Sequence, residues 1–155
     1  MRRKEREVKD RSALVDILDR SRVCHLGFTV DNIPYIVPMF FGYKWNEKLI
    51  LFFHCAKKGR KLDCLARNDR VCFEMEADCE IKKGAKACGW SSRYSSIMGT
   101  GRMRKAATEE ERAEGLNLIM RHYGGPEKNE FDPESMLKTE VLVLTVEEIS
   151  GKKAG

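Results

Sequence analysis

Residues 49–61 read LILFFHCAKKGRK and combine a short apolar run with a strongly basic turn. The run covers residues 49–53, and its length and composition predict a strand that is buried on both faces. His54 and Cys55 follow the run directly. The segment therefore predicts a buried strand that delivers an imidazole, a thiol and a group of cations to one edge of the core.

The basic turn, residues 56–61, has the composition of an anion-binding site. Gly59 gives the turn flexibility, and the spacing of Leu62 and Leu65 predicts a helix that begins directly afterwards. A glycine-bearing turn from a strand into a helix exposes backbone N–H groups beside the positive end of the helix dipole. These features predict a phosphate-binding turn. The pattern leaves open an alternative, which is a solvated Lys/Arg turn after a core strand.

Length and composition predict one domain with a substantial core. The chain has 155 residues, of which 42% are hydrophobic. We expect a single domain over residues 1–155, with residues 1–9 as a flexible basic arm and residues 150–155 as a polar tail. No apolar run approaches a membrane span, and the N-terminus lacks a secretory signal, so we expect a cytoplasmic protein with no membrane partner. The net charge of +5 is spread along the chain, which does not favour nucleic-acid binding.

Cysteine spacing argues against a structural metal site. The six cysteines are spaced by seven or more residues, so the sequence has no CxxC pair. Structural zinc sites commonly take their ligands from such pairs. We therefore expect buried, reduced thiols and no bound metal. The cysteines are Cys24, Cys55, Cys64, Cys72, Cys79 and Cys88.

Hydrophobic periodicity predicts a mostly β protein with about six strands. Apolar alternation and turn residues place the strands at residues 23–30, 33–43, 49–53, 70–75, 87–104 and 141–149. Pro34 and Pro38 cannot donate to a ladder, so the second strand should be an edge strand, bulged, or broken near Pro38. Gly42 in that strand would let another chain or a flat ligand approach closely. Strands and helices do not alternate regularly, which favours an antiparallel barrel with flanking helices.

Capping signals predict where the helices begin. Asp10 or Ser12 is suited to cap a short helix near the N-terminus. Thr108 and Glu111 form a capping box before a longer amphipathic helix. Asp132 followed by proline indicates one further turn of helix.

The three histidines receive different interpretations. His25 lies on an alternating strand, where a packed or surface role is favoured over a ligand role. His122 lies near the predicted C-terminus of the long helix, where the helix dipole favours a cation and a structural role is expected. His54 separates a buried strand from a basic turn, and its position leaves structural and functional roles equally open.

Three motifs, in this order, carry a resemblance to a known family. They are VPMFFGY (residues 37–43), FFHCAKKGRKLDCL (residues 52–65) and ACGWSSRYSSIMGTGR (residues 87–102). Together they resemble the nitroimidazole-resistance branch of the pyridoxamine 5′-phosphate oxidase-like flavoproteins. RRKEREV at residues 2–8 and ISGK at residues 149–152 are also similar, so the resemblance covers nearly the whole chain. It implies a split β-barrel and a two-fold homodimer that binds FMN, or FAD, at the subunit interface.

The resemblance also implies a set of site residues. One segment would line the flavin ring with backbone groups: Val37, Pro38, Met39, Phe41 and Gly42. A second would pass beneath the cofactor near its ribityl chain: Phe53, His54, Cys55 and Ala56. Arg60 and Lys61 would hold the phosphate. A third segment would complete the site: Arg93, Tyr94, Ser95 and Ser96. Close family members often have asparagine where this chain has Phe40, and the difference bears on the substrate more than on the cofactor.

The expected function follows from the resemblance. We expect an FMN-dependent oxidoreductase that passes electrons from NAD(P)H to a small acceptor such as a nitroimidazole, with His54 as the catalytic residue. The alternative is a flavin- or haem-binding protein without turnover, which would serve as a sensor or carrier on the same barrel.

Overall fold

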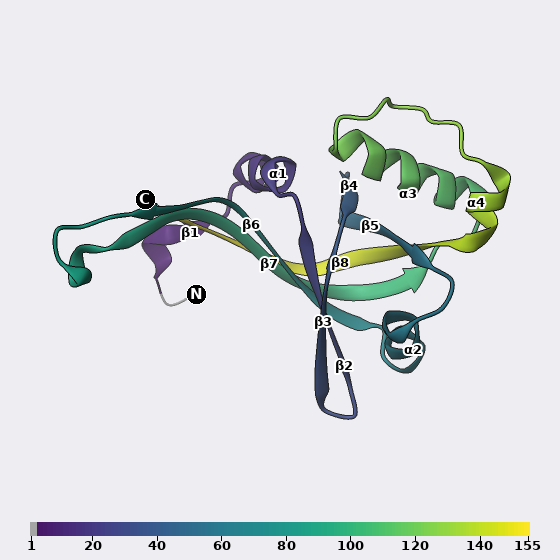
Figure 1. Cartoon of the computed structure of the whole chain (residues 1–155), viewed down its shortest axis with the longest axis horizontal. Coiled ribbons are helices and arrows are strands. Elements are labelled where there is room, and N and C mark those ends of the chain that lie inside the picture. Colours follow the sequence, from purple (N-terminus) through teal and green to yellow (C-terminus); the bar gives the residue numbers. More distant parts are fainter. Residues whose placement is uncertain (1–2) are drawn as a thin grey trace.

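The computed structural model describes residues 3–155 and contains one antiparallel sheet with flanking helices (Figure 1). The strand order is β3-β2-β6-β7-β8-β5-β4, and β1 pairs with β8 outside this path. The mostly β, antiparallel class that the sequence predicts is confirmed, with eight strands instead of about six. The strands are β1 (Glu7–Val8), β2 (Cys24–Val30), β3 (Ile33–Met39), β4 (Phe41–Trp45), β5 (Leu49–Ala56), β6 (Arg70–Lys82), β7 (Ser91–Lys105) and β8 (Thr139–Ala154).

The single strand expected at residues 33–43 is two strands, β3 and β4, with Phe40 between them. β3 is an edge strand, as its prolines predict, and it forms a hairpin with β2 through a turn at Asp31 and Asn32. Both turn residues have positive φ, which suits a two-residue hairpin turn. The break falls at Phe40 and not at Pro38, because Pro38 still lies opposite His25 in the β2–β3 ladder.

The sheet is curled because β3 and β4 form its two opposite edges. Only Phe40 lies between them in the chain, so the two edges must come close together at this residue. The core fills the space inside the curl, where Phe41 pairs with Phe53 and both are fully buried. The sheet remains open and does not close into a continuous barrel, since β3 and β4 are not paired with each other.

Three of the α-helices in the described part of the chain start directly after the expected capping residues. α1 (Arg11–Arg20) is capped by Asp10, α3 (Glu109–His122) by Thr108, and α4 (Pro133–Lys138) by Asp132, and each side chain accepts a hydrogen bond from a backbone N–H of the first turn. α2 (Arg60–Arg67) follows β5 directly. Figure 1 shows α3 and α4 together at one end of the sheet. Among residues 3–155, no helix is both long enough and apolar enough to span a bilayer.

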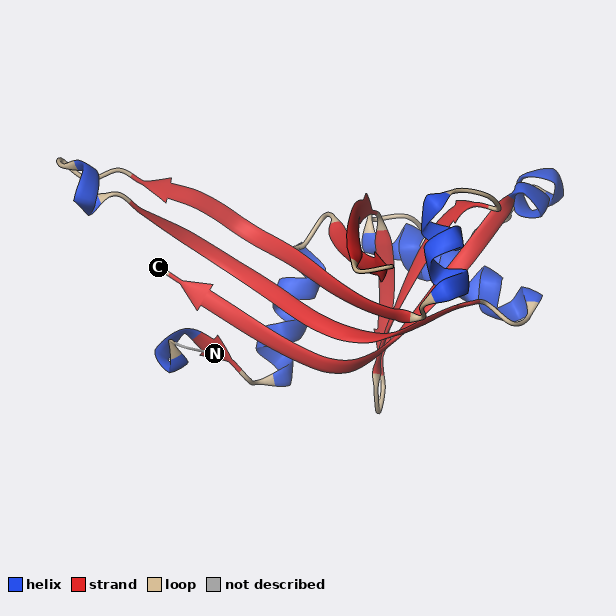
Figure 2. Ribbon diagram, turned by 90° about the horizontal axis from the view of Figure 1, so that it is seen from below, coloured by secondary structure: helices blue, strands red, loops and turns tan. Residues whose placement is uncertain are grey.

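The two ends of the chain are more ordered than the sequence predicts. The expected polar tail, residues 150–155, is mostly the last part of β8, and the expected flexible arm includes β1. Glu7 and Val8 pair with Lys152 and Gly151, so each segment supplies the backbone partners of the other. Residues 1–2 of the expected arm lie outside the described part of the chain. Figure 2 shows the N- and C-terminal segments side by side.

Residues 77–86, which lie between two of the predicted strands, are largely strand. β6 continues to Lys82, and β6 and β7 form a long hairpin arm that extends away from the part of the fold that holds α2 (Figure 1). A short 3-10 turn, Ala87–Gly89, lies near its tip. Pairing with β7 keeps these polar side chains on a strand, even though most of them are exposed.

Gly42 marks the point where α3 packs directly on β4. A Cβ atom at this position would overlap the backbone of Leu118 and Ile119 and would lie 2.6 Å from the Leu118 carbonyl oxygen. The close approach that the sequence allows at Gly42 is therefore made by a helix of the same chain.

Gly42→Ala should lower the free energy of unfolding by about 1–3 kcal/mol, because overpacking against backbone atoms forces the helix to move. Thermal or urea unfolding measures the change. Gly89→Ala is the matched control, since its Cβ would meet only the Gly84 Cα at 3.6 Å. An unchanged stability of the Gly42 variant would show that α3 does not press on β4.

Candidate functional site

The basic turn after β5 leads into a helix N-terminus that no side chain caps. Gly59 is the N-cap residue, with φ of 137°, and it makes no side-chain cap hydrogen bond. Its carbonyl oxygen accepts hydrogen bonds from the N–H groups of Leu62 and Asp63. This backbone conformation is strongly favoured by glycine. The first N–H groups of α2 therefore point out of the turn, where an anion would find the positive end of the helix dipole.

The cations of the turn reach towards two neighbouring strands. The Arg60 guanidinium carbon lies 4.5 Å from the centre of the Tyr35 ring on β3. Lys61 is half-buried, and its charge partly offsets the effect of burial, which raises the pKa of the Cys55 thiol. The contact with Tyr35 holds the turn against β3, the strand that also carries residues 37–39 of the first segment named by the resemblance.

Several residues of the first two segments are buried and offer a ligand only their backbone. Phe41 and Phe53 are fully buried in the core, and Gly42 is covered by α3. The Phe41 N–H already donates to the Tyr123 hydroxyl at 3.2 Å. Pro38, in contrast, is exposed on the outer face of β3.

Val37 and Met39 are half-buried and pack against the core cluster. Their side chains therefore belong to the inner face of β3. Like Phe41, these two residues can contact a ligand outside the core only through their backbone atoms. The expectation that this segment contacts a ligand through backbone groups agrees with this burial.

His54 and Ala56 are exposed at the end of β5, whereas Cys55 between them is half-buried. His54 lies opposite Val141 of β8 in the ladder. Among residues 3–155, no hydrogen bond or ion pair engages the His54 ring. Within this part of the chain, the ring nitrogens of His54 therefore do not hold the turn that follows β5.

The third segment lies on the hairpin arm, away from the other two (Figure 1). Arg93 faces Glu80 of β6 at 3.7 Å, and the Lys152 ammonium lies 5.3 Å from the centre of the Tyr94 ring. Ser95 is buried, and Ser96 pairs with Glu76. Arg93 therefore does not reach the basic turn of the same chain.

The cavities of this structure differ in volume. The cavity beside Arg60 and Tyr35 measures about 220 Å³, below the roughly 300–1,000 Å³ typical of ligand sites. A groove of about 830 Å³ crosses the outer face of the sheet. It is lined by His25, Gly27, Ile36, Cys72, Phe73, Glu74, Glu76, Met98, Gly99, Thr100, Glu148, Ile149 and Ser150. The sequence analysis missed this groove, because its residues come from five different strands that are distant in sequence.

The floor of the groove carries an unexpected group of charges. His25 Nδ1 lies 3.3 Å from Glu74 Oε2, and Glu76 is two residues further along the same strand. Burial raises the pKa of Glu74, and the neighbouring Glu76 carboxyl raises it further. His25 is thus half-buried on a sheet face, as the sequence predicts, but it belongs to a cluster.

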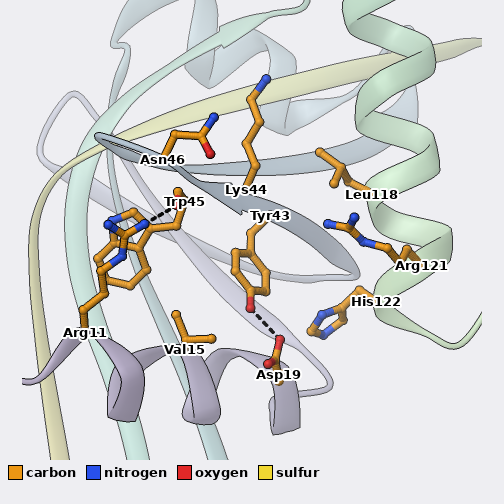
Figure 3. A pocket seen from close by; sticks show the side chains of 10 residues that line it. All are labelled: Arg11, Val15, Asp19, Tyr43, Lys44, Trp45, Asn46, Leu118, Arg121 and His122. Atoms are coloured by element: carbon orange, nitrogen blue, oxygen red, sulfur yellow. Dashed lines mark hydrogen bonds between the residues drawn. The ribbon is translucent and has the colours of Figure 1, made fainter. Parts of the chain in front are cut away.

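A third cavity, of about 550 Å³, separates α1 from β4 and α3 (Figure 3). The Tyr43 hydroxyl donates to Asp19, and burial followed by this bond raises the pKa of Tyr43. The Arg121 side chain points towards the same space (Figure 3). None of the flavin-site residues implied by the resemblance lines this cavity, which is bounded by Arg11, Val15, Asp19, Tyr43, Lys44, Trp45, Asn46, Leu118, Arg121 and His122.

His122 has a structural role at the rim of that cavity. Its Nε2 atom lies 2.9 Å from the Ser21 carbonyl oxygen, and its ring lies 4.3 Å from the Phe41 ring. Burial lowers the pKa of His122, so desolvation outweighs the effect of the helix C-terminus that the sequence analysis invoked.

Comparison with known proteins identifies the family. The sequence profile described as pyridoxamine 5′-phosphate oxidase matches residues 10–153. This chain belongs to the pyridoxamine 5′-phosphate oxidase family. The family resemblance and the split-barrel fold that the sequence predicts are thereby confirmed. A search of curated proteins finds no significant match.

Solved structures of similar proteins agree with this assignment. One, from Bacteroides thetaiotaomicron, is a proposed 5-nitroimidazole antibiotic resistance protein with 27% identity and a TM-score of 0.82, over 95% of this chain and 86% of that chain. A flavocytochrome from Azotobacter vinelandii has 20% identity and a TM-score of 0.82, over 100% and 72%. A FAD and haem binding protein from Mycobacterium smegmatis has 18% identity and a TM-score of 0.81, over 96% and 73%. The last two show the shared split-barrel fold.

His122 should make this family member less stable in mild acid. The folded protein keeps the imidazole neutral at pH values where the unfolded chain, with a pKa near 6.5, takes up a proton. The free energy of unfolding should therefore fall as the pH falls below about 6.5 and should stop falling below the folded-state pKa. Urea unfolding between pH 7.5 and pH 5 measures this. His122→Gln cannot titrate, so its decline over this range should be smaller than that of the wild type. Parallel curves for the two proteins would contradict the assignment.

Proposed function

We propose that the protein is a homodimeric FMN-dependent oxidoreductase that reduces a small acceptor, such as a nitroimidazole, with electrons from NAD(P)H. The observation that carries the proposal is the basic, glycine-capped turn at the end of β5, whose helix N-terminus has no side-chain cap. Membership of the pyridoxamine 5′-phosphate oxidase family supports a flavin as the ligand. FMN, when bound, supplies the exchange of electrons with nicotinamide and acceptor.

The residues at the turn fit a phosphate group. Lys61 and the first N–H groups of α2 would meet the phosphate oxygens, and Arg60 adds a second cation. Stacking on Tyr35 restricts the Arg60 side chain, which reduces the entropy lost on binding. Tyr35 lies on β3, and the outer face of the same strand would hold the flavin ring system through backbone groups.

A second copy of the chain would complete the site. The cavity at the turn is small, and the segment with Arg93 lies on an arm that cannot reach the turn of its own protomer. β3 is an edge strand that exposes 62% of Ile33 and 68% of Ile36. Exposed apolar side chains on an unpaired edge are typical of a surface that another chain covers. A two-fold dimer would cover this edge and place each arm at the partner's turn.

His54 is the residue of this chain best suited to proton transfer. Its ring is exposed, lies within three residues of the turn and has no partner among residues 3–155. Held beside the reacting groups, a ring nitrogen would donate a proton to the acceptor as the acceptor gains electrons. An imidazole is suited to this step because it gains and loses protons near neutral pH.

The alternative of flavin or haem binding without turnover is separated from this proposal by one observation. If NADH or NADPH bleaches the bound flavin and an added nitroimidazole restores its colour, the protein is a reductase. A flavin that resists both nicotinamides, or a haem spectrum in the purified protein, would favour a carrier or sensor.

Lys61→Ala should weaken FMN binding by about 1.5–3 kcal/mol, the usual value of a hydrogen bond to a charged group. Riboflavin, which lacks the phosphate, should bind almost as before. Lys57→Ala removes an exposed charge from the same turn and should cost less than about 1 kcal/mol. Fluorescence titration of the apoproteins measures the affinity of Lys61→Ala for FMN and for riboflavin and the affinity of Lys57→Ala for FMN. Equal losses for FMN and riboflavin would indicate a structural role for Lys61.

Mixing the Lys61→Ala variant with an Arg93→Ala variant tests whether two chains together form one FMN site. Random reassortment makes half of the dimers mixed, and each mixed dimer has one site with both wild-type residues, so about one quarter of all sites should regain FMN affinity. No recovery after unfolding and refolding the mixture together would mean that Lys61 and Arg93 do not meet across an interface.

His54→Gln should fold and bind FMN within a few-fold of the wild type, because the side chain is exposed and similar in size. It should lose about 100-fold in acceptor reduction, the low end for a lost acid–base group. Anaerobic stopped-flow measures the two half-reactions separately, and reduction of the flavin by NAD(P)H should change little. Wild-type rates in both half-reactions would remove His54 from the mechanism.

A further inference from the structure

The groove on the outer face of the sheet contains three potential metal ligands in one cluster. His25 on β2 lies directly opposite Glu74 on β6, and Glu76 is two residues further along β6. Residues two apart on a strand project to the same face, so strand pairing alone brings the three side chains together. One ligand atom from each lies within 4.8 Å of the others.

The histidine in this cluster is buried at one nitrogen and lacks a hydrogen bond there. His25 Nδ1 is enclosed, and although Glu74 Oε2 lies 3.3 Å away, the geometry is not that of a hydrogen bond. Buried polar atoms nearly always have a partner, and an exception calls for an explanation such as a bound ion. An ion bound between the imidazole and the carboxylate would satisfy the Nδ1 lone pair.

The charges also call for a cation. Glu74 and Glu76 are close enough to repel each other, and among residues 3–155 His25 is the group that acts on Glu74 with the opposite sign. Within residues 3–155, no lysine or arginine forms an ion pair with either carboxylate. Glu74 is half-buried in a groove lined by Ile36 and Met98, so its carboxylate is partly desolvated and a nearby cation would stabilise it.

We propose that His25, Glu74 and Glu76 bind a divalent first-row metal ion at the floor of this groove. One imidazole nitrogen and two carboxylate oxygens are a ligand set that such ions accept. An ion at about 2.0–2.2 Å from each donor needs the donors roughly 3–4 Å apart, so small rotations of the exposed Glu76 side chain suffice. Three protein donors leave a coordination position open towards the groove.

This inference does not depend on the proposed flavin chemistry, but the proposed dimer would strengthen it. If a second copy covers the groove, water leaves the two carboxylates, and the energetic need for a bound cation grows.

Mn²⁺ is the appropriate probe, because carboxylate ligands suit it and thiolates do not. Zn²⁺ would also bind the exposed thiols of Cys72, Cys79 and Cys88. Loss of the free Mn²⁺ signal in electron paramagnetic resonance measures binding to the purified protein. We expect one Mn²⁺ per chain in the wild type. His25→Gln, Glu74→Gln and Glu76→Gln should each weaken binding at least about tenfold, the smallest effect expected for loss of a direct ligand.

Two control variants keep the test specific. Glu148→Gln removes a carboxylate that lines the same groove outside the cluster, and His54→Gln removes an exposed imidazole elsewhere. Both should retain wild-type Mn²⁺ affinity. The proposal is overturned if the wild type binds no Mn²⁺, or if the cluster variants and controls bind it equally. Because Glu76 is exposed, its variant should fold, and unchanged binding by that variant with lost binding by Glu148→Gln would also overturn it.

Discussion

The hydroxyl of Tyr123 connects the two sides of the split in this sheet, and much of the structure depends on it. It donates to the Arg22 carbonyl at 2.8 Å, just before β2, and accepts from the Phe41 N–H at the start of β4. Met39 and Phe41 lie on opposite edges of the sheet, yet their Cα atoms can be at most about 7–8 Å apart, since each peptide spans 3.8 Å. Tyr123, at the end of α3, therefore holds the chain in place where it crosses from one edge of the sheet to the other.

Closure at this point determines where the basic turn lies. Phe41 pairs with Phe53 inside the core, and β5 continues three residues further to its end at Ala56. The same curl brings β3 alongside α2, where Tyr35 meets Arg60. The phosphate-binding half of the proposed site is therefore built from rigid elements. The other half lies on the hairpin arm, so one chain cannot provide both.

The sequence predicts the inner face of the fold much better than its outer face. The apolar run at residues 49–53, the Asp31–Asn32 turn and the capping residues Asp10, Thr108 and Asp132 are local signals, and the structure agrees with each. The length of the β6–β7 arm and the pairing of β1 with β8 were missed, because polar strands carry no hydrophobic period and rely on backbone partners distant in sequence.

The proposed site shows the same contrast between features with a local sequence signal and features that depend on distant residues. Gly59 and the cations beside it could be recognised within six residues of sequence, whereas the flavin itself could come only from the family resemblance. The cluster at His25 was taken for an isolated histidine, because its partners lie some fifty residues away and meet it only through the β2–β6 ladder. A His-x-Gly and a Glu-x-Glu pattern on neighbouring strands is a signal only when the strand order is known.

The two proposed sites lie on different strands of the outer face of the sheet, the flavin along β3 and the ion at β2 and β6. Leu26 points into the core, while His25 points outward and lies opposite Pro38, the middle residue of the Val37–Met39 segment proposed to line the flavin. Proline donates no hydrogen bond, so β3 is tied to β2 at this point less tightly than elsewhere. A ligand held by His25 would stabilise β2 opposite this proline. The outer face of the sheet would then be ordered from both sides, by the flavin along β3 and by the ion at β2 and β6.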